Sequence, residues 1–293
     1  MKKIIAFLLQ IVSKILKNIA DTTNFTRSTI NFIKLRYLEF VPRSDDIFIV
    51  TYPRSGTTWM QMILYQLASD GNMDFDHISQ VCPWFERLAI KGKNFEHLCS
   101  PRIFKSHLAY KWIPKNSGKY IYVVRNVKDV AISNFHFFAS HLGLDRQMTF
   151  SEFFDIFMKG KILWGNWFYH VNGWWSHKDE ENVLILHYED LVQDLEVCLY
   201  KIIDFCGLEV SQERFPEILE KCNFAFMKKH ESKFDSTMEK ILEQGLIKNS
   251  FIRKGKVNNA HNYFTEELEK TLDEKFNEYQ ELALNFRNLT YSE

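Results

Sequence analysis

A short segment at residues 51–59, TYPRSGTTW, combines hydroxyl side chains, a guanidinium and a glycine directly after an apolar run that predicts a strand. A helix is expected to begin within it, and the first turn of a helix offers unpaired N–H groups and a partial positive charge to phosphate or sulfate. Arg54 adds a forked cation, and Gly56 allows the backbone to approach an anion closely. The hydroxyl donors are Ser55, Thr57 and Thr58. The spelling G-x-x-x-x-G-K-[ST] is absent, so the residues predict an anion site without naming the anion, and a well-capped helix start stays the simpler alternative.

Other chemically active side chains follow further predicted strands. Runs rich in branched and aromatic residues, which predict strands, lie at 47–51, 102–105, 120–125 and 182–188, and helical patterns lie at 58–67, 127–140 and 191–205. Strands that alternate with helices predict a parallel α/β sheet, in which ligands bind at the carboxyl ends of the strands. Arg54, Lys105, His107 and Arg125 all fall at such ends. We therefore expect one site assembled from several strand ends.

Length and composition restrict the class of protein. The chain has 293 residues, of which 46% are hydrophobic and 25% charged, as in an ordinary globular protein rather than a disordered one. The formal net charge is zero, which argues against a general nucleic-acid binder. Five cysteines are scattered singly, at positions 82, 99, 198, 206 and 222. That pattern favours a reducing compartment such as the cytoplasm and argues against a disulfide framework or a zinc ribbon.

Residues 1–20 have the pattern of a basic amphipathic helix. The polar face carries Lys3, Gln10, Lys14 and Lys17, and the opposite face carries Ile4, Leu8, Ile11, Ile15 and Ile19. No small-x-small cleavage site follows, and the run is too short and too charged to cross a bilayer. Two interpretations stay open: peripheral contact with a membrane surface, or packing of the apolar face on the domain. Residues 21–44 are expected to connect this helix to a single catalytic domain at 45–293.

Several motifs together resemble the cytosolic sulfotransferases, which use 3′-phosphoadenosine-5′-phosphosulfate (PAPS). Residues 52–59 are similar to the family's 5′-phosphosulfate loop, Y-P-K-S-G-T-T-W, except that Arg54 replaces the lysine. The other similar segments are R-N-V-K-D-V-A-I-S at 125–133, R-K-G at 253–255, K-S-H at 105–107, W-W at 174–175 and Y-E-D at 188–190. The resemblance covers about residues 45–265. It implies a P-loop-like three-layer sandwich around a central parallel sheet, in a single domain.

The resemblance also implies a role for individual residues toward PAPS. The phosphosulfate end would be held by Arg54, Ser55, Gly56, Thr57 and Thr58. The 3′-phosphate would be held by Arg125, Ser133, Arg253, Lys254 and Gly255, and Phe251 and Ile252 would be further residues that bind PAPS. The adenine would lie between Trp59 and Phe224, with Tyr188 and Cys222 at its edge. His107 would be the general base that deprotonates the acceptor, and Lys105 and Arg54 would stabilise charge on the transferring group. No metal is needed, and no metal-ligand spacing is found.

The acceptor is expected to be a small, hydrophobic molecule with a hydroxyl or amine group. Aromatic residues in the segments that form the acceptor pocket of similar enzymes are Trp84, Phe85, Phe137, Phe138 and Tyr169. Apolar walls around one catalytic polar group are typical of small-molecule sites. For any one of these rings, an ordinary place in the core is an equal alternative.

Three departures from the family pattern qualify this interpretation. Arg54 is a poor acid, so it stabilises charge without donating a proton. Cys222 and Asn223 replace a common Thr-Ser pair, and N-N-A-H-N at 258–262 replaces G-D-W-K-T, a segment tied to a small dimer contact. We therefore expect a monomer or an atypical dimer. The alternative functions are a catalytically inactive, membrane-associated nucleotide-binding module and, less favoured, a P-loop-type phosphotransferase.

Overall fold

The computed structural model of the chain describes residues 30–91, 95, 97–115, 118–142, 148–162, 164–234 and 263–286. The predictions made for residues 1–20, 251–255 and 258–262 lie outside the described residues.

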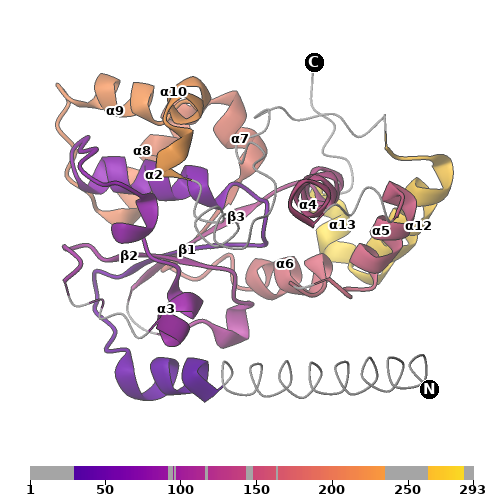
Figure 1. Cartoon of the computed structure of the whole chain (residues 1–293). Coiled ribbons are helices and arrows are strands. Elements are labelled where there is room, and N and C mark those ends of the chain that lie inside the picture. The colour runs from indigo at the N-terminus through magenta and orange to yellow at the C-terminus, as the bar shows by residue number, and fades with distance from the viewer. Residues whose placement is uncertain are drawn as a thin grey trace, which may run out of the picture.

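Four strands form one parallel sheet at the centre of the molecule (Figure 1). They are β1 (Ile47–Thr51), β2 (Ile103–Ser106), β3 (Lys119–Val124) and β4 (Val183–His187), in the spatial order β2-β1-β3-β4. Each predicted strand is present, with ends within one residue of those expected. Because every pair is parallel, the carboxyl ends of all four strands lie at the same edge of the sheet.

Helices cover both faces of this sheet (Figure 1). One face packs against α2 (Thr57–Ala68), η2 (Ile78–Gln80), α7 (Tyr188–Gln193), α8 (Leu195–Cys206), α9 (Phe215–Lys221) and α10 (Phe224–Lys229). The other packs against η1 (Leu35–Glu39), α3 (Phe85–Lys91), α4 (Val127–Leu142), α5 (Phe150–Met158), α6 (Trp167–Trp175), α12 (Glu266–Glu278) and α13 (Gln280–Phe286). The short helices η3 (Tyr110–Trp112) and η5 (Glu231–Lys233) complete the described elements. The three-layer sandwich predicted from the sequence is confirmed.

The central strand β1 contributes to two hydrophobic cores, one on each face of the sheet. All five of its residues are buried, because the strand faces helices on both sides. Successive side chains of a strand point to opposite faces, so Phe48 and Val50 join one core cluster while Ile47 and Ile49 join the other. The continuous apolar run is therefore the pattern of a doubly covered parallel strand.

One helix prediction was wrong in detail. Residues 191–205 were expected to form a single helix, but the segment belongs to two, α7 and α8, which meet at Asp194. Asp194 leaves helical geometry, with φ −145°, and its carboxylate accepts the Val197 N–H at 3.0 Å. An aspartate that caps a new helix competes with continuation of the previous one. The end of the predicted connector is also helical, over residues 30–39, and buries Leu35.

A buried ion pair fixes the amino-terminal ends of β1 and β2. Arg102 donates to the Asp46 carboxylate from Nε at 2.7 Å and from Nη2 at 2.9 Å, and both side chains are fully buried. Arg102 Nη2 also donates to the Val41 carbonyl at 2.9 Å. This paired geometry satisfies several hydrogen-bonding groups at once, which a buried ion pair requires.

Asp46→Asn should destabilise the protein by about 3–5 kcal/mol, because it leaves the Arg102 guanidinium buried without a matching charge. The free energy of unfolding in urea measures this. The matched control is Lys159→Gln, which breaks the exposed pair between Lys159 and Asp155, and it should change stability by less than about 1 kcal/mol. Equal effects of the two substitutions would contradict the structural importance of the buried pair.

Candidate active site

The loop between β1 and α2 holds two residues in the left-handed backbone conformation. Arg54 has φ 75° and Gly56 has φ 93°. At Gly56 an added Cβ would lie 2.7 Å from Cδ2 of Tyr188, so the position requires glycine both for its backbone angle and for space. At Arg54 the same conformation costs about 1–2 kcal/mol. Strain of this kind is typical of functional sites.

The loop offers donors that the described chain does not satisfy. Ser55 is fully buried, and its hydroxyl has no hydrogen-bond partner among the described residues. Gly56, which precedes α2, has no side chain to accept from the N–H groups of the first turn, where Thr57 and Thr58 lie. Buried donors without partners are costly unless an anion or water bonds them. The segment therefore has the properties of the predicted anion site.

Two further predicted residues contact this loop. Arg54 Nε donates to the Ser133 hydroxyl of α4 at 3.2 Å, and Arg125 Nη1 donates to the Arg54 carbonyl at 3.2 Å. The Arg125 guanidinium lies 4.3 Å from the centre of the Tyr188 ring, and its Nε is buried without a hydrogen-bond partner in the described part of the chain. Arg125 and Ser133 are predicted to hold the 3′-phosphate. They therefore lie beside the loop that is predicted to hold the phosphosulfate. The remaining members of that cluster, residues 251–255, are outside the described residues.

Trp59 leads away from the loop toward the residues predicted for adenine. Its Nε1 donates to the Cys222 carbonyl at 2.6 Å, and its ring meets Tyr188 edge-on with centroids 5.5 Å apart. The Cys222 side chain is fully buried, so its contact with this region is made through its backbone. Phe224, two residues further on, is 39% exposed. Trp59, Tyr188 and the Cys222 carbonyl therefore meet in one region, and Phe224 follows Cys222 closely along the chain.

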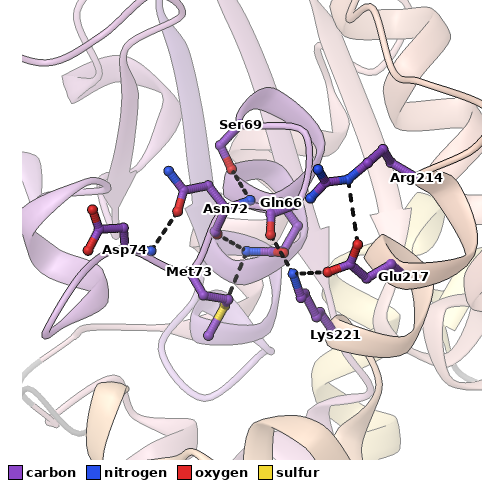
Figure 2. Close-up of polar contacts among 9 residues, drawn as sticks. Gln66, Ser69, Asn72, Met73, Asp74, Arg214, Glu217 and Lys221 are labelled. Atoms are coloured by element: carbon purple, nitrogen blue, oxygen red, sulfur yellow. Dashed lines mark hydrogen bonds and ion pairs between the residues drawn. The ribbon is translucent and has the colours of Figure 1, made fainter.

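A polar network at the far end of α2 holds α9 in place (Figure 2). The Gln66 amide donates to the Asn72 carbonyl at 2.6 Å, and the Lys221 ammonium donates to the Gly71 carbonyl at 2.5 Å. Because Cys222 directly follows Lys221, these bonds also set the position of the carbonyl that the indole of Trp59 contacts. Neither end of this network carries an obvious sequence motif, and the sequence interpretation missed it.

His107 directly follows β2, and its ring orientation is set by the neighbouring strand. Its Nδ1 lies 2.9 Å from the Thr51 carbonyl, which can only accept, so Nδ1 carries the proton and Nε2 presents a lone pair. The Thr51 hydroxyl lies 2.6 Å from that of Thr57 in the anion loop. The His107 carbonyl is 3.1 Å from Nε2 of the buried His170. The predicted base is therefore joined to the predicted anion loop through one residue, Thr51.

Burial dominates the ionisation of the groups around His107. Burial, with the neighbouring Lys105 charge as the next cause, lowers the pKa of His107 well below its ordinary value of 6.5. Burial also lowers the pKa of Lys105 to about 8, with the Arg87 charge acting in the same direction. Glu86 accepts the backbone N–H of His107 at 2.7 Å, and burial raises the pKa of its carboxyl. At neutral pH the imidazole is uncharged and able to accept a proton, while Lys105 remains mostly cationic.

The residues predicted for the acceptor pocket do not all meet at His107. The Trp84 ring stands edge-on to the imidazole at 5.2 Å, and the Phe137 ring lies 5.1 Å from the Arg54 guanidinium. Phe138 packs against Phe137, with centroids 5.6 Å apart. Phe85, in contrast, is fully buried in the core, where its ring packs 5.0 Å from that of Phe40.

Tyr169 lies away from His107, whereas Trp164, for which no role was predicted, lies close to it. Tyr169 is 50% exposed, and its ring faces the Lys111 ammonium at 5.3 Å. Trp164, which the sequence interpretation missed, lies 6.0 Å from His107 and 6.2 Å from Trp84 between ring centroids. The residue after it, Gly165, accepts the Tyr52 hydroxyl through its carbonyl at 2.8 Å, a contact that the local sequence does not indicate.

The chain can be compared with models of known protein families and with known relatives. The family model of the sulfotransferase domain matches residues 44–285. The chain belongs to the sulfotransferase family. Among its relatives, sulfotransferase 1C2 of Homo sapiens is 33% identical over 284 residues, which cover 92% of this chain and 95% of that protein. The amine sulfotransferase of Oryctolagus cuniculus is 34% identical over 265 residues, 87% of each chain.

Solved structures of sulfotransferases share the fold. The crystal structure of mouse sulfotransferase SULT7A1 complexed with PAP matches with a TM-score of 0.68 and 29% identity, over 85% of this chain and 88% of that one. Retinol dehydratase in a complex with retinol and PAP matches with a TM-score of 0.70 and 26% identity, over 89% and 88% of the two chains. The sulfotransferase prediction is confirmed, and neither the inactive binding module nor the P-loop-type phosphotransferase is favoured.

We expect the native His107 imidazole to stay neutral at pH 6.5, where an ordinary histidine is half protonated, because burial and the Lys105 charge both lower its pKa. In Lys105→Met that pKa should rise yet stay below 6.5, since burial is the larger cause. Nitrogen-15 NMR of the imidazole measures both values. In the unfolded chain His107 ionises near 6.5, so this residue should destabilise the fold as the pH falls below 6.5. A native signal that titrates at or above 6.5 would contradict the buried neutral state.

Proposed function

We propose that this sulfotransferase moves a sulfuryl group from PAPS to a hydroxyl or amine of a small, mainly apolar acceptor, with His107 as the general base. The observation that carries the proposal is the hydrogen bond from His107 Nδ1 to the Thr51 carbonyl at 2.9 Å. It leaves Nε2 as the proton acceptor and holds it beside the anion loop that Thr51 begins.

The proposed reaction is an in-line displacement. Nε2 of His107 takes the proton of the acceptor group, whose oxygen or nitrogen then forms a bond to the sulfur. The bond between the sulfur and the bridging oxygen breaks, and its electron pair stays on the departing phosphate. Lys105 and Arg54 stabilise the negative charge on the transferring group and the leaving oxygen. A guanidinium is too weak an acid to protonate that oxygen, so Arg54 acts through charge alone.

The donor assignment is supported by two clusters of basic and hydroxyl groups. The unpartnered Ser55 hydroxyl and the first turn of α2 suit the phosphosulfate, and Arg125 with Ser133 suits the 3′-phosphate. Trp59 and the exposed ring of Phe224 suit the adenine. Two solved relatives are complexes with PAP, the product that PAPS leaves after transfer.

We also propose that the protein works in the cytoplasm as a monomer or with an atypical dimer contact. All five cysteines are described, and none forms a disulfide, as expected in a reducing compartment. The sequence N-N-A-H-N at 258–262 supports the second part of the proposal, because it departs from the G-D-W-K-T segment that the family resemblance ties to a dimer contact.

His107→Asn should lower the turnover number for sulfuryl transfer by about 10²–10⁴-fold, because the variant lacks the basic Nε2. The Asn amide can still donate to the Thr51 carbonyl, so the strand contact is kept. Transfer of labelled sulfate from PAPS to a panel of alcohols, phenols and amines measures the rate. Affinity for PAP, measured by calorimetry, should be unchanged. Full-rate transfer by His107→Asn would remove the base assignment, and the absence of any transfer by the wild type would overturn the activity.

Residues 1–20 are proposed to bind an anionic membrane surface. Lysines on one face of their helical pattern suit acidic lipids, and the opposite apolar face suits the acyl boundary. The exposed apolar side chains that follow support this, with Ile30, Ile33, Tyr37, Leu38 and Val41 each 49–78% exposed. None of the helices in the described residues is long and apolar enough to span a bilayer.

Deletion of residues 1–20 should abolish co-sedimentation of the protein with phosphatidylserine vesicles, because it removes both the lysines and the apolar face. Vesicles of phosphatidylcholine alone should bind the full chain more weakly, and high salt should release it from the acidic vesicles. Unchanged partitioning of the deletion variant would mean that the segment packs on the domain instead.

A further inference from the structure

Arg87 is a cation beside Trp84, and the reaction proposed above gives it no role. It belongs to α3, and its guanidinium carbon lies 4.2 Å from the centre of the Trp84 ring. Its side chain makes no hydrogen bond or ion pair with the part of the chain that the structure describes. A guanidinium that only stacks on an indole keeps its five N–H donors for another group.

The charge of Arg87 reaches the reacting groups. The Trp84 indole on which it stacks meets His107 edge-on at 5.2 Å, and the Lys105 ammonium lies 4.7 Å from the centre of the same indole. The Arg87 charge lowers the pKa of both Lys105 and His107. An acceptor whose hydroxyl lies at His107 and whose body packs on Trp84 would therefore experience the field of Arg87.

Among the described residues, Glu86 offsets this field only in part, because one carboxylate stands beside the two cations Arg87 and Lys105. The Glu86 charge raises the pKa of both Arg87 and Lys105, while its carboxylate accepts the His107 backbone N–H at 2.7 Å rather than bonding the Arg87 guanidinium. Arg54, the third cation of the group, is bonded to Ser133 on the donor side. The acceptor side of the described site thus has an excess of positive charge.

The order of the strands separates Arg87 from the donor clusters. Arg125 follows β3 and Ser133 lies on α4, whereas Trp84 pairs with Lys105 of β2, on the opposite side of β1. Arg87 stacks on that indole and so lies on the β2 side of the site. Its place is that of a group which contacts the acceptor.

We propose that Arg87 determines acceptor specificity by binding an anionic group of the acceptor. The acceptor class is an apolar ring compound that carries a hydroxyl for transfer and, separately, a carboxylate or similar acidic group. A guanidinium binds such a group through two parallel hydrogen bonds. Acceptors that carry an ammonium group are disfavoured by the same charge. This inference rests on the proposed function and specifies its substrate class.

The test uses three phenols that differ only in side-chain charge: 4-propylphenol, 3-(4-hydroxyphenyl)propanoate and tyramine. The wild type should give the highest kcat/KM with the propanoate and the lowest with tyramine. In Arg87→Gln the ratio of kcat/KM between the propanoate and the neutral phenol should fall on the order of tenfold, the size of one partly solvated charge interaction. In Arg87→Glu the order of propanoate and tyramine should reverse. The ratio is the informative quantity, because removing Arg87 also shifts Lys105 and His107 for every acceptor.

Binding of the same three phenols, measured by calorimetry with PAP present, tests the acceptor assignment separately from the proposed sulfuryl transfer. If the wild type binds the propanoate in preference to tyramine but transfers no sulfate, the proposed function fails and the acceptor assignment stands. If all three ratios are unchanged in Arg87→Gln and Arg87→Glu, Arg87 does not recognise the acceptor. Lys159→Gln, which removes an exposed cation of α5, should leave every ratio as in the wild type. Equal melting temperatures confirm that the variants fold.

Discussion

The hydrogen bond from His107 to the Thr51 carbonyl is the contact on which the arrangement of the site depends. It joins the carboxyl ends of two neighbouring parallel strands, and Thr51 in turn bonds Thr57 at the start of α2. One residue therefore orients both the base and the first turn of the anion-binding helix. The buried pair of Arg102 and Asp46 holds the opposite ends of the same two strands, so the register that the chemistry needs is fixed at both ends.

Burial decides which protonation states this site can hold. A buried imidazole favours its neutral form, and His107 is therefore ready to accept a proton at neutral pH. Lys105, with a pKa lowered to about 8, keeps most of its charge at neutral pH, as its proposed role requires. The same desolvation strengthens every electrostatic interaction in the site, because the surroundings respond less than water does. Burial is thus the largest cause of the lowered pKa of both His107 and Lys105.

The donor loop shows how a substitution can be accommodated by its surroundings. Arg54 occupies a left-handed backbone position and is held by the Ser133 hydroxyl and by the Phe137 ring. These contacts fix a planar, permanently charged group where a lysine would present a mobile ammonium. In the proposed reaction, Arg54 would therefore stabilise the charge on the leaving oxygen without giving it a proton.

Much of this could be predicted from local sequence. The strands, the parallel sheet and the anion loop follow from periodicity and from Gly56, because backbone angle and alternation of burial are local properties. The break at Asp194 was missed because a capping side chain can override a continuous helical pattern.

Only the tertiary structure decided which side chains meet. The sequence by itself determined that His107 and Thr51 end two strands, but their hydrogen bond depends on β1 and β2 being neighbours in the sheet. Phe85 packs in the core, whereas Trp164 lies near His107. Both are aromatic residues with other aromatic residues close by in the sequence, so the sequence alone does not distinguish their places. Residue type and spacing indicate which chemistry a side chain can perform. Contacts between distant segments, and the desolvation that shifts pKa values, arise only when the layers pack together.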